Sequence, residues 1–79
     1  MTTVSGSEFQ AIRRRLGLSV VTFGRALGYA GNDNTVSTVV RRYESDGRPI
    51  PPAIGRLAVM LDRHGIPAEF LATADPPRR

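Results

Sequence analysis

The sequence predicts an all-α protein, a compact bundle of four to five helices that contains a helix-turn-helix. Apolar residues recur at intervals of three and four along most of the chain, which is the period of amphipathic helices. Glycine or proline stands at the boundaries of these stretches, where helices end or begin. The 79 residues leave room for one domain, and the chain has no cysteine for disulfides or thiolate metal sites. We expect this domain to span residues 5–72, between a flexible arm at 1–4 and a flexible tail at 73–79.

The first two predicted helices have clear start and stop signals. Ser5 and Glu8 have the spacing of a capping box, and Gly17 suits the left-handed conformation that ends a helix. Ser19 is a good N-cap for the second helix, which we expect to end at Gly28. Two short helices therefore open the domain.

The third predicted helix follows a turn at residues 28–34 and continues to about Ser45. Asp33 or Asn34 can cap it. Valine is a mediocre helix former, so a strand is the competing interpretation, but the spacing of the apolar residues favours a helix. The apolar face of this helix is predicted to carry Val36, Val39, Val40 and Tyr43.

The last two predicted helices follow a loop at residues 45–52. Pro51 or Pro52 suits the first turn of the fourth helix, and Gly65 ends that helix. Pro67 opens a short fifth helix. The core stripe of the fourth helix is predicted to be Ile54, Leu57, Ala58 and Leu61.

The charge balance indicates an anionic partner. Eleven arginines oppose seven acidic residues, which gives a formal net charge of +4, and there is no lysine. Arginine forms paired hydrogen bonds with guanine edges and with phosphates. A preference of GC-rich genomes for arginine codons is the competing explanation. No apolar run is long enough to span a bilayer and no signal-peptide pattern is present, so we expect a cytoplasmic protein with no membrane partner.

The second and third predicted helices have the features of a helix-turn-helix, whose second helix enters the major groove of DNA. Gly24 costs roughly 1 kcal/mol relative to alanine inside a helix, so we expect another helix to approach closely there. Gly28 lies at the turn, and Tyr29 supplies an apolar residue after it. Together these residues predict a DNA-reading helix at about residues 34–45.

The chain resembles the Cro/lambda-repressor-like, or XRE-type, helix-turn-helix family over about residues 8–65. The stretches that carry the resemblance are IRRRLGLSVVTFGRALGY and VVRRYESDGRPIPPAIGRLAVML. The resemblance implies a lambda-repressor-like domain of five helices that often binds an inverted repeat as a dimer. Among family members of this size, it implies an autorepressor of a phage or mobile element, such as an anti-CRISPR-associated regulator, or an antitoxin.

Two positions depart from the pattern of that family. Alanine usually stands where this chain has Gly24. The loop after Gly28 is longer, by about two residues if Val36 is the first anchor of the reading helix and by about six if Val40 is. Because the register of the helix depends on this choice, the base contacts are predicted as a set.

The predicted DNA-reading surface is the face of the third helix opposite its apolar stripe. Asparagine and arginine read adenine and guanine edges, whereas serine and threonine donate to phosphate or contact the thymine methyl group. A merely solvated helix face is the competing interpretation, but this face carries two arginines and no acid between residues 34 and 43. The predicted base-reading residues are Asn34, Ser37, Thr38, Arg41 and Arg42, and the predicted phosphate-binding residues are Ser19, Thr22, Ser45 and Arg48.

Several polar residues have simpler structural interpretations. Ser19 serves equally well as a cap without any contact with DNA. The run 13–15 is all arginine, but consecutive helical residues point three ways, so a solvated face is favoured over a phosphate site. We expect Glu44 to form an ion pair with an arginine and His64 to interact with the end of its helix.

Apolar residues beyond the core stripe predict a homodimer interface near the C-terminus. A fuller core, in which the fifth helix folds back, is the alternative. The chain has one histidine and no catalytic motif, so we expect no enzyme activity, metal, cofactor or small-molecule substrate. The predicted interface residues are Val59, Met60, Ile66, Phe70 and Leu71.

These features together predict a sequence-specific regulator of transcription that binds double-stranded DNA. We expect a repressor that binds an inverted repeat as a homodimer. The alternative is a protein-binding module, an antitoxin or inhibitor, whose arginines bind an acidic protein. Specific DNA binding would weaken steeply with salt and would prefer one palindromic site, which distinguishes the two functions.

Overall fold

The structure is a computed structural model that describes residues 4–72, with side chains described for residues 4–70. The described residues form five α-helices and no strand, which confirms the predicted all-α class. The expected tail at 73–79 and residues 1–3 of the expected arm lie outside the described residues. The helices are α1 (Gly6–Leu16), α2 (Val20–Ala26), α3 (Asp33–Glu44), α4 (Pro52–His64) and α5 (Ala68–Ala72).

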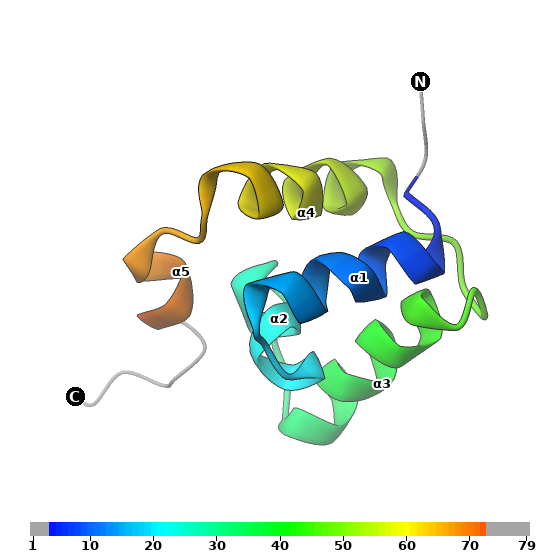
Figure 1. Cartoon of the computed structure of the whole chain (residues 1–79). Helices are drawn as coiled ribbons and strands as arrows, with labels where there is room; N and C mark the ends of the chain where they lie inside the picture. The colour runs from blue at the N-terminus through cyan, green and yellow to red at the C-terminus, as the bar shows by residue number, and fades with distance from the viewer. Residues whose placement is uncertain (1–3, 73–79) are drawn as a thin grey trace.

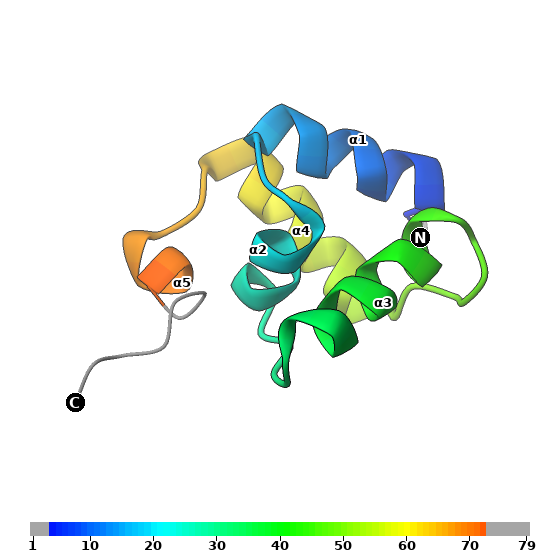
Figure 2. The same ribbon diagram turned by 90° about the horizontal axis from the view of Figure 1, so that it is seen from below.

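The helices pack around α1 and α2 (Figure 1). In that view α1 lies between α4 and α3 and packs against both of them. Helix α2 packs mainly against α3, and α5 rests against α2 at the end of the molecule away from the loop between α3 and α4. Turning the molecule shows α2 and α3 side by side beneath α1 (Figure 2). The helix-turn-helix pair α2 and α3 therefore forms one side of the bundle.

The N-terminal end of α1 is capped as predicted. The hydroxyl group of Ser5 accepts a hydrogen bond from the backbone N–H of Glu8, whose carboxylate in turn accepts one from the Ser5 N–H. Gly17 ends the helix with a φ of 73°. Val4 belongs to the expected flexible arm, but its side chain is partly buried against the core and lies beside Gly55, so this residue packs on the domain.

The core is built from aromatic and branched side chains of α1, α2, α3 and α4. The rings of Phe9 and Phe23 lie 4.9 Å apart, and Tyr43 meets Phe9 edge-on at 5.8 Å. From α4, Ala58 and Leu61 are buried as predicted, whereas the rest of its predicted stripe is only partly buried. The buried hydrophobic residues are Phe9, Ile12, Phe23, Ala26, Leu27, Val36, Val40, Tyr43, Ile50, Ala58 and Leu61.

Gly24 is the point of closest approach between α2 and α3, as predicted. A β-carbon on this residue would overlap a γ-methyl group of Val36 and would lie 3.0 Å from a γ-methyl group of Val40. Glycine therefore allows the two helices to pack directly on each other, which fixes α3 against the core.

The start of α3 differs from the prediction by one residue. The N-cap is Asn32, not Asp33 or Asn34: its side chain accepts a hydrogen bond of 2.8 Å from the N–H of Thr35. The reason is that the Asp33 carboxylate is engaged by an arginine of α2. The guanidinium group of Arg25 binds the Asp33 carboxylate at 2.8 Å and also donates to the carbonyl of residue 31 at 2.9 Å. This contact closes the turn between α2 and α3.

Two ion pairs connect α1 to its neighbours. Arg13 binds Glu44 of α3 with two hydrogen bonds of 2.6 and 3.2 Å, which confirms the expected structural role of Glu44. Gln10 donates to the same carboxylate. Arg15 binds Asp62 of α4 at 2.7 Å, and this hydrogen bond lowers the pKa of Asp62 below its ordinary value and raises the pKa of Arg15.

Candidate nucleic-acid interface

The predicted base-reading residues lie together on the side of α3 that faces away from the core. The packed side of the helix is formed by Val36, Val40 and Tyr43, all buried. Because an α-helix advances 100° per residue, the side opposite them is exposed. Of the predicted set, only Ser37 is half-buried and the others are exposed. We call this set the α3 outer face: Asn34, Ser37, Thr38, Arg41 and Arg42.

Both arginines of the α3 outer face are free to bind a ligand. Arg41 and Arg42 are exposed, and within residues 4–70 neither forms an ion pair. Both acidic residues of α3 are paired with arginines of neighbouring helices: Glu44 forms a largely buried pair with an arginine of α1, and Asp33, whose side chain is 79% exposed, pairs with an arginine of α2. The unpaired charge of α3 is therefore positive.

The hydroxyl groups of the α3 outer face are already engaged within the helix. Thr38 donates to the backbone carbonyl of Asn34 at 2.8 Å, and Ser37 donates to the same carbonyl at 3.2 Å. No hydrogen bond engages the side-chain amide of Asn34 in the described part of the chain. The amide and the two guanidinium groups are thus the hydrogen-bonding groups of this face that remain available to a ligand.

The predicted phosphate-binding residues are only partly brought together. The hydroxyl group of Ser19 accepts from the Thr22 N–H at 3.1 Å and donates to the Thr22 hydroxyl at 3.0 Å, so both residues are engaged in capping α2. Ser45 donates to the carbonyl of residue 42 at 3.3 Å. Arg48 lies exposed in the loop that follows α3 and is the only one of the four that brings a positive charge.

A tyrosine pair, not predicted from the sequence, supports the inner side of α3. The hydroxyl groups of Tyr29 and Tyr43 are 2.8 Å apart and share a hydrogen bond. Burial, together with this hydrogen bond, raises the pKa of Tyr29 well above its ordinary value, against a smaller opposing effect of the Arg48 charge. The Tyr29 phenol therefore stays neutral, and its hydrogen bond to Tyr43 connects the turn after α2 to the last turn of α3.

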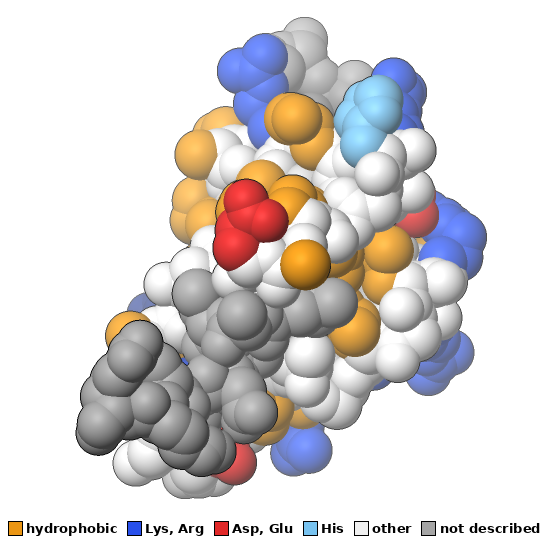
Figure 3. All heavy atoms as spheres, turned by 90° about the vertical axis from the view of Figure 1, so that its left-hand side faces the viewer, with side chains coloured by type: hydrophobic (Ala, Val, Ile, Leu, Met, Phe, Trp, Pro, Cys, Tyr) orange, Lys and Arg blue, Asp and Glu red, His pale blue; other side chains and the backbone are white. Residues whose placement is uncertain are grey.

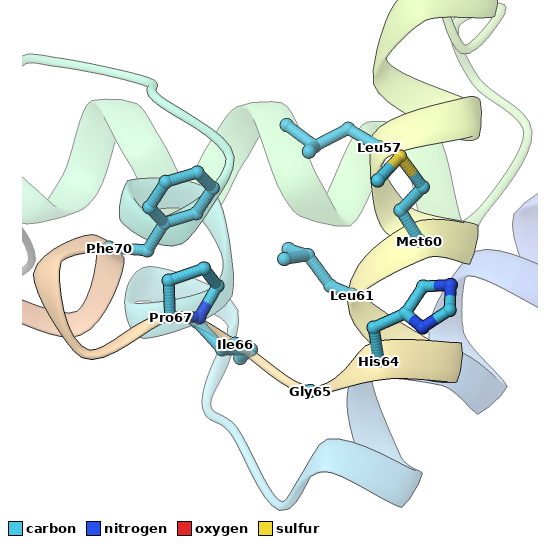
Figure 4. Close-up of a pocket in the computed structure, with 8 residues that line it drawn as sticks. All are labelled: Leu57, Met60, Leu61, His64, Gly65, Ile66, Pro67 and Phe70. Carbon is cyan, nitrogen blue, oxygen red and sulfur yellow. The ribbon is translucent and has the colours of Figure 1, made fainter.

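Three of the predicted dimer residues, Met60, Ile66 and Phe70, line an apolar groove between α4 and α5. Met60 is 58% exposed, and the groove has a volume of about 320 Å³. Figure 4 shows Leu57 and Leu61 projecting from α4 toward Phe70 and Pro67 on the opposite wall. The groove is lined by Leu57, Met60, Leu61, His64, Gly65, Ile66, Pro67 and Phe70.

The members of the predicted dimer set differ in exposure. Val59 does not line the groove and is partly buried against the core, because it lies on the side of α4 that faces the bundle. Ile66 and Phe70 line the groove but also pack against the core, as the fuller-core alternative anticipated. The side chain of Leu71 lies outside the described residues. Figure 3 shows hydrophobic side chains exposed around the single histidine, His64, with arginines at the edge of this surface.

Neither a metal site nor a membrane span is found in the described residues. They contain no group of three or more histidine, cysteine, aspartate or glutamate side chains placed to hold a metal ion. None of the five helices has both the length and the hydropathy needed to cross a bilayer. Comparison of the chain with protein-family models, with curated proteins and with solved structures finds no match.

Proposed function

We propose that the protein is a sequence-specific regulator of transcription that binds double-stranded DNA by inserting α3 into the major groove. One observation carries the proposal: Arg41 and Arg42 are exposed and unpaired on a helix whose two acidic residues both pair with arginines of neighbouring helices. Two forks of guanidinium donors on a rigid helix are suited to the guanine edges and phosphates of a major groove.

The dimensions of the α3 outer face agree with a short DNA site. Asn34 and Arg41 are seven residues apart, which corresponds to about 10 Å along a helix. Base pairs are stacked at about 3.4 Å, so these side chains span about three base-pair steps. Asparagine suits adenine and arginine suits guanine, and each well-placed pair contributes roughly 1–3 kcal/mol of discrimination.

The protein acts as a homodimer in this proposal. The α4–α5 groove exposes Met60 and is apolar, and a second copy of the chain covers it. A two-fold dimer presents two α3 helices, so its binding site is an inverted repeat with half-sites about 34 Å apart.

The cellular role that fits best is repression, including repression of the protein's own gene. Occupation of a promoter by a DNA-binding domain is sufficient for repression, and the five described helices supply such a domain in this proposal. Membership of the XRE-type family, and an origin in a phage or mobile element, stay proposals that rest on the resemblance. A regulator of transcription acts in the compartment that contains the DNA, and this proposal agrees with the expected cytoplasmic location.

The experiment that tests the proposal is selection from a library of random-sequence duplexes with the purified full-length protein. We expect one inverted-repeat motif to be enriched and to bind about a thousandfold more tightly than a scrambled duplex. The logarithm of the affinity should fall linearly with the logarithm of salt concentration, with a slope set by the number of phosphates contacted.

The negative outcomes of this selection are equally informative. Enrichment of no motif, with equal affinity for every duplex, contradicts sequence-specific binding. No binding to DNA at low salt, together with binding to an acidic protein, replaces the proposal by the protein-binding module. Selection with an Arg41→Ala, Arg42→Ala double variant serves as the control, and it should enrich no motif.

A further inference from the structure

Thr38 lies at the centre of the α3 outer face. Asn34 precedes it by one helical turn, and Arg41 and Arg42 follow it by one turn, so all four residues are displayed on the same side of α3. Thr38 is exposed. A helix that presents this face to a base-pair edge therefore brings Thr38 to the edge as well.

The hydroxyl group of Thr38 is not available as a donor. Its single proton is used in the hydrogen bond of 2.8 Å to the Asn34 carbonyl, within the same helix. That bond also fixes the χ1 rotamer of a β-branched side chain, which holds its γ-methyl group in one position. The hydroxyl oxygen can still accept a hydrogen bond, but the methyl group is the apolar part of the exposed side chain that can meet a base without breaking the existing bond.

In the major groove, thymine is the only base that presents a methyl group, and threonine methyl groups form apolar contacts with it. We propose that Thr38 selects thymine through its γ-methyl group and not through its hydroxyl group. The inference rests on the proposed DNA-binding function of α3. Because four helical residues span about 6 Å, the selected thymine lies within about two base-pair steps of a guanine read by Arg41 or Arg42.

Ser37 provides an internal comparison. Its hydroxyl group donates to the same Asn34 carbonyl at 3.2 Å, but its side chain has no methyl group and is half-buried. The adjacent serine therefore cannot make the same selection. The difference between the two residues isolates the methyl group as the chemical feature that matters at Thr38.

The test replaces each thymine of the selected duplex, one at a time, by uracil, which lacks the C5-methyl group. For the parent protein we expect one thymine in a half-site whose replacement weakens binding about fourfold, the factor that corresponds to about 0.8 kcal/mol for one buried methyl group. Thr38→Val keeps a methyl group and removes the hydroxyl, so it should keep this sensitivity. Thr38→Ser keeps the hydroxyl and removes the methyl, so it should bind both duplexes equally.

The opposite pattern overturns the inference. If Thr38→Ser keeps the sensitivity to uracil and Thr38→Val loses it, the hydroxyl group makes the contact. If the protein binds its duplex specifically but no uracil replacement weakens binding, the thymine contact is overturned. The proposed DNA-binding function is then unaffected. A selection that enriches no motif overturns both. Thermal unfolding followed by circular dichroism confirms that the two variants, at an exposed helical position, are folded.

Discussion

At the scale of single residues, the packing of α2 on α3 depends on Gly24, because glycine has no β-carbon to separate the two helices. The atoms nearest to its position belong to Val36 and Val40, whose branched side chains have little freedom to move aside. A glycine in a helix was the sequence signal for this close approach, because glycine costs stability there unless a neighbour needs the space.

We expect Gly24→Ala to lower the free energy of unfolding by about 1 kcal/mol. Overpacking a core costs roughly 1–3 kcal/mol, which exceeds the roughly 1 kcal/mol that alanine gains in helix propensity. Chemical denaturation measures the change. In a Val36→Ala background the same substitution should be neutral or stabilising, because the Val36 methyl group that the new β-carbon would overlap is gone. Equal effects in both backgrounds would show that the two residues do not compete for space.

Other residue-level features could not be predicted because they join distant parts of the chain. Asp46 has a φ of 62°, and its carboxylate accepts a hydrogen bond of 2.9 Å from the N–H of Gly6. A β-carbon on Gly6 would lie 2.6 Å from the carbonyl oxygen of Glu44. No local pattern indicates that the start of α1 rests on the end of α3, since forty residues separate Gly6 from Asp46.

At the scale of elements, two ion pairs of the same chemistry hold α1 in different surroundings. The side chains of Arg13 and Glu44 are 15% and 7% exposed, whereas Arg15 is 59% exposed. When one member of a buried ion pair is removed, the other member is left buried without a counter-charge. When the pair is exposed, water solvates the remaining charge. The connection of α1 to α3 is therefore the sensitive one.

We expect Glu44→Ala to lower the free energy of unfolding by about 3 kcal/mol, because Arg13 is left buried without its counter-charge. Asp62→Ala removes the partner of Arg15 and is the matched control, for which thermal unfolding should change little. If the two variants unfold alike, burial does not distinguish the pairs. The expectation that Glu44 forms an ion pair came from the sequence, but the choice of Arg13 among eleven arginines required the structure.

The ends of most helices were predictable, since their signals are local. Ser5, Ser19 and Gly17 act as predicted, because a capping hydrogen bond or a left-handed residue involves only the next few positions. The sequence determined the start of α3 less well, because each of residues 32 to 34 is able to cap a helix. The contact of Arg25 across the turn selects Asn32, and that contact depends on the arrangement of α2 relative to α3.

At the scale of the whole molecule, the α4–α5 groove is the apolar surface that a second copy would cover. We expect Met60→Asp to convert the proposed dimer into a monomer, because it places an unpaired charge in the apolar contact. Sedimentation equilibrium measures the mass. The affinity for the full inverted repeat should fall about a hundredfold, since linked half-sites contribute at least this factor.

Ala53→Asp is the matched control for this substitution. It adds the same charge to an exposed position in the first turn of α4, outside the groove, where a carboxylate is tolerated. This variant should remain dimeric. A dimeric Met60→Asp protein, or a parent protein that is monomeric at the concentrations at which it binds DNA, contradicts the proposed interface.

The sequence predicted the candidate site as a set but not its electrostatics. Helical periodicity was sufficient to place Asn34, Thr38 and the two arginines on one exposed face. The neutralisation of Asp33 and Glu44 by arginines of α2 and α1 depends on tertiary contacts, as does the half-burial of Ser37. Those contacts leave Arg41 and Arg42 as the unpaired charges of α3 among the described residues.

The most direct measurement is the affinity of Arg41→Ala and Arg42→Ala for the selected duplex and for its single-base variants. Arg56→Ala is the charge-matched control, because Arg56 is exposed on α4, which lies on the other side of α1 from α3 (Figure 1). We expect each α3 variant to lose roughly 1–3 kcal/mol of discrimination at one base pair, while Arg56→Ala keeps the full preference. Unchanged base preference in both α3 variants, or an equal loss in Arg56→Ala, would mean that α3 does not read the DNA.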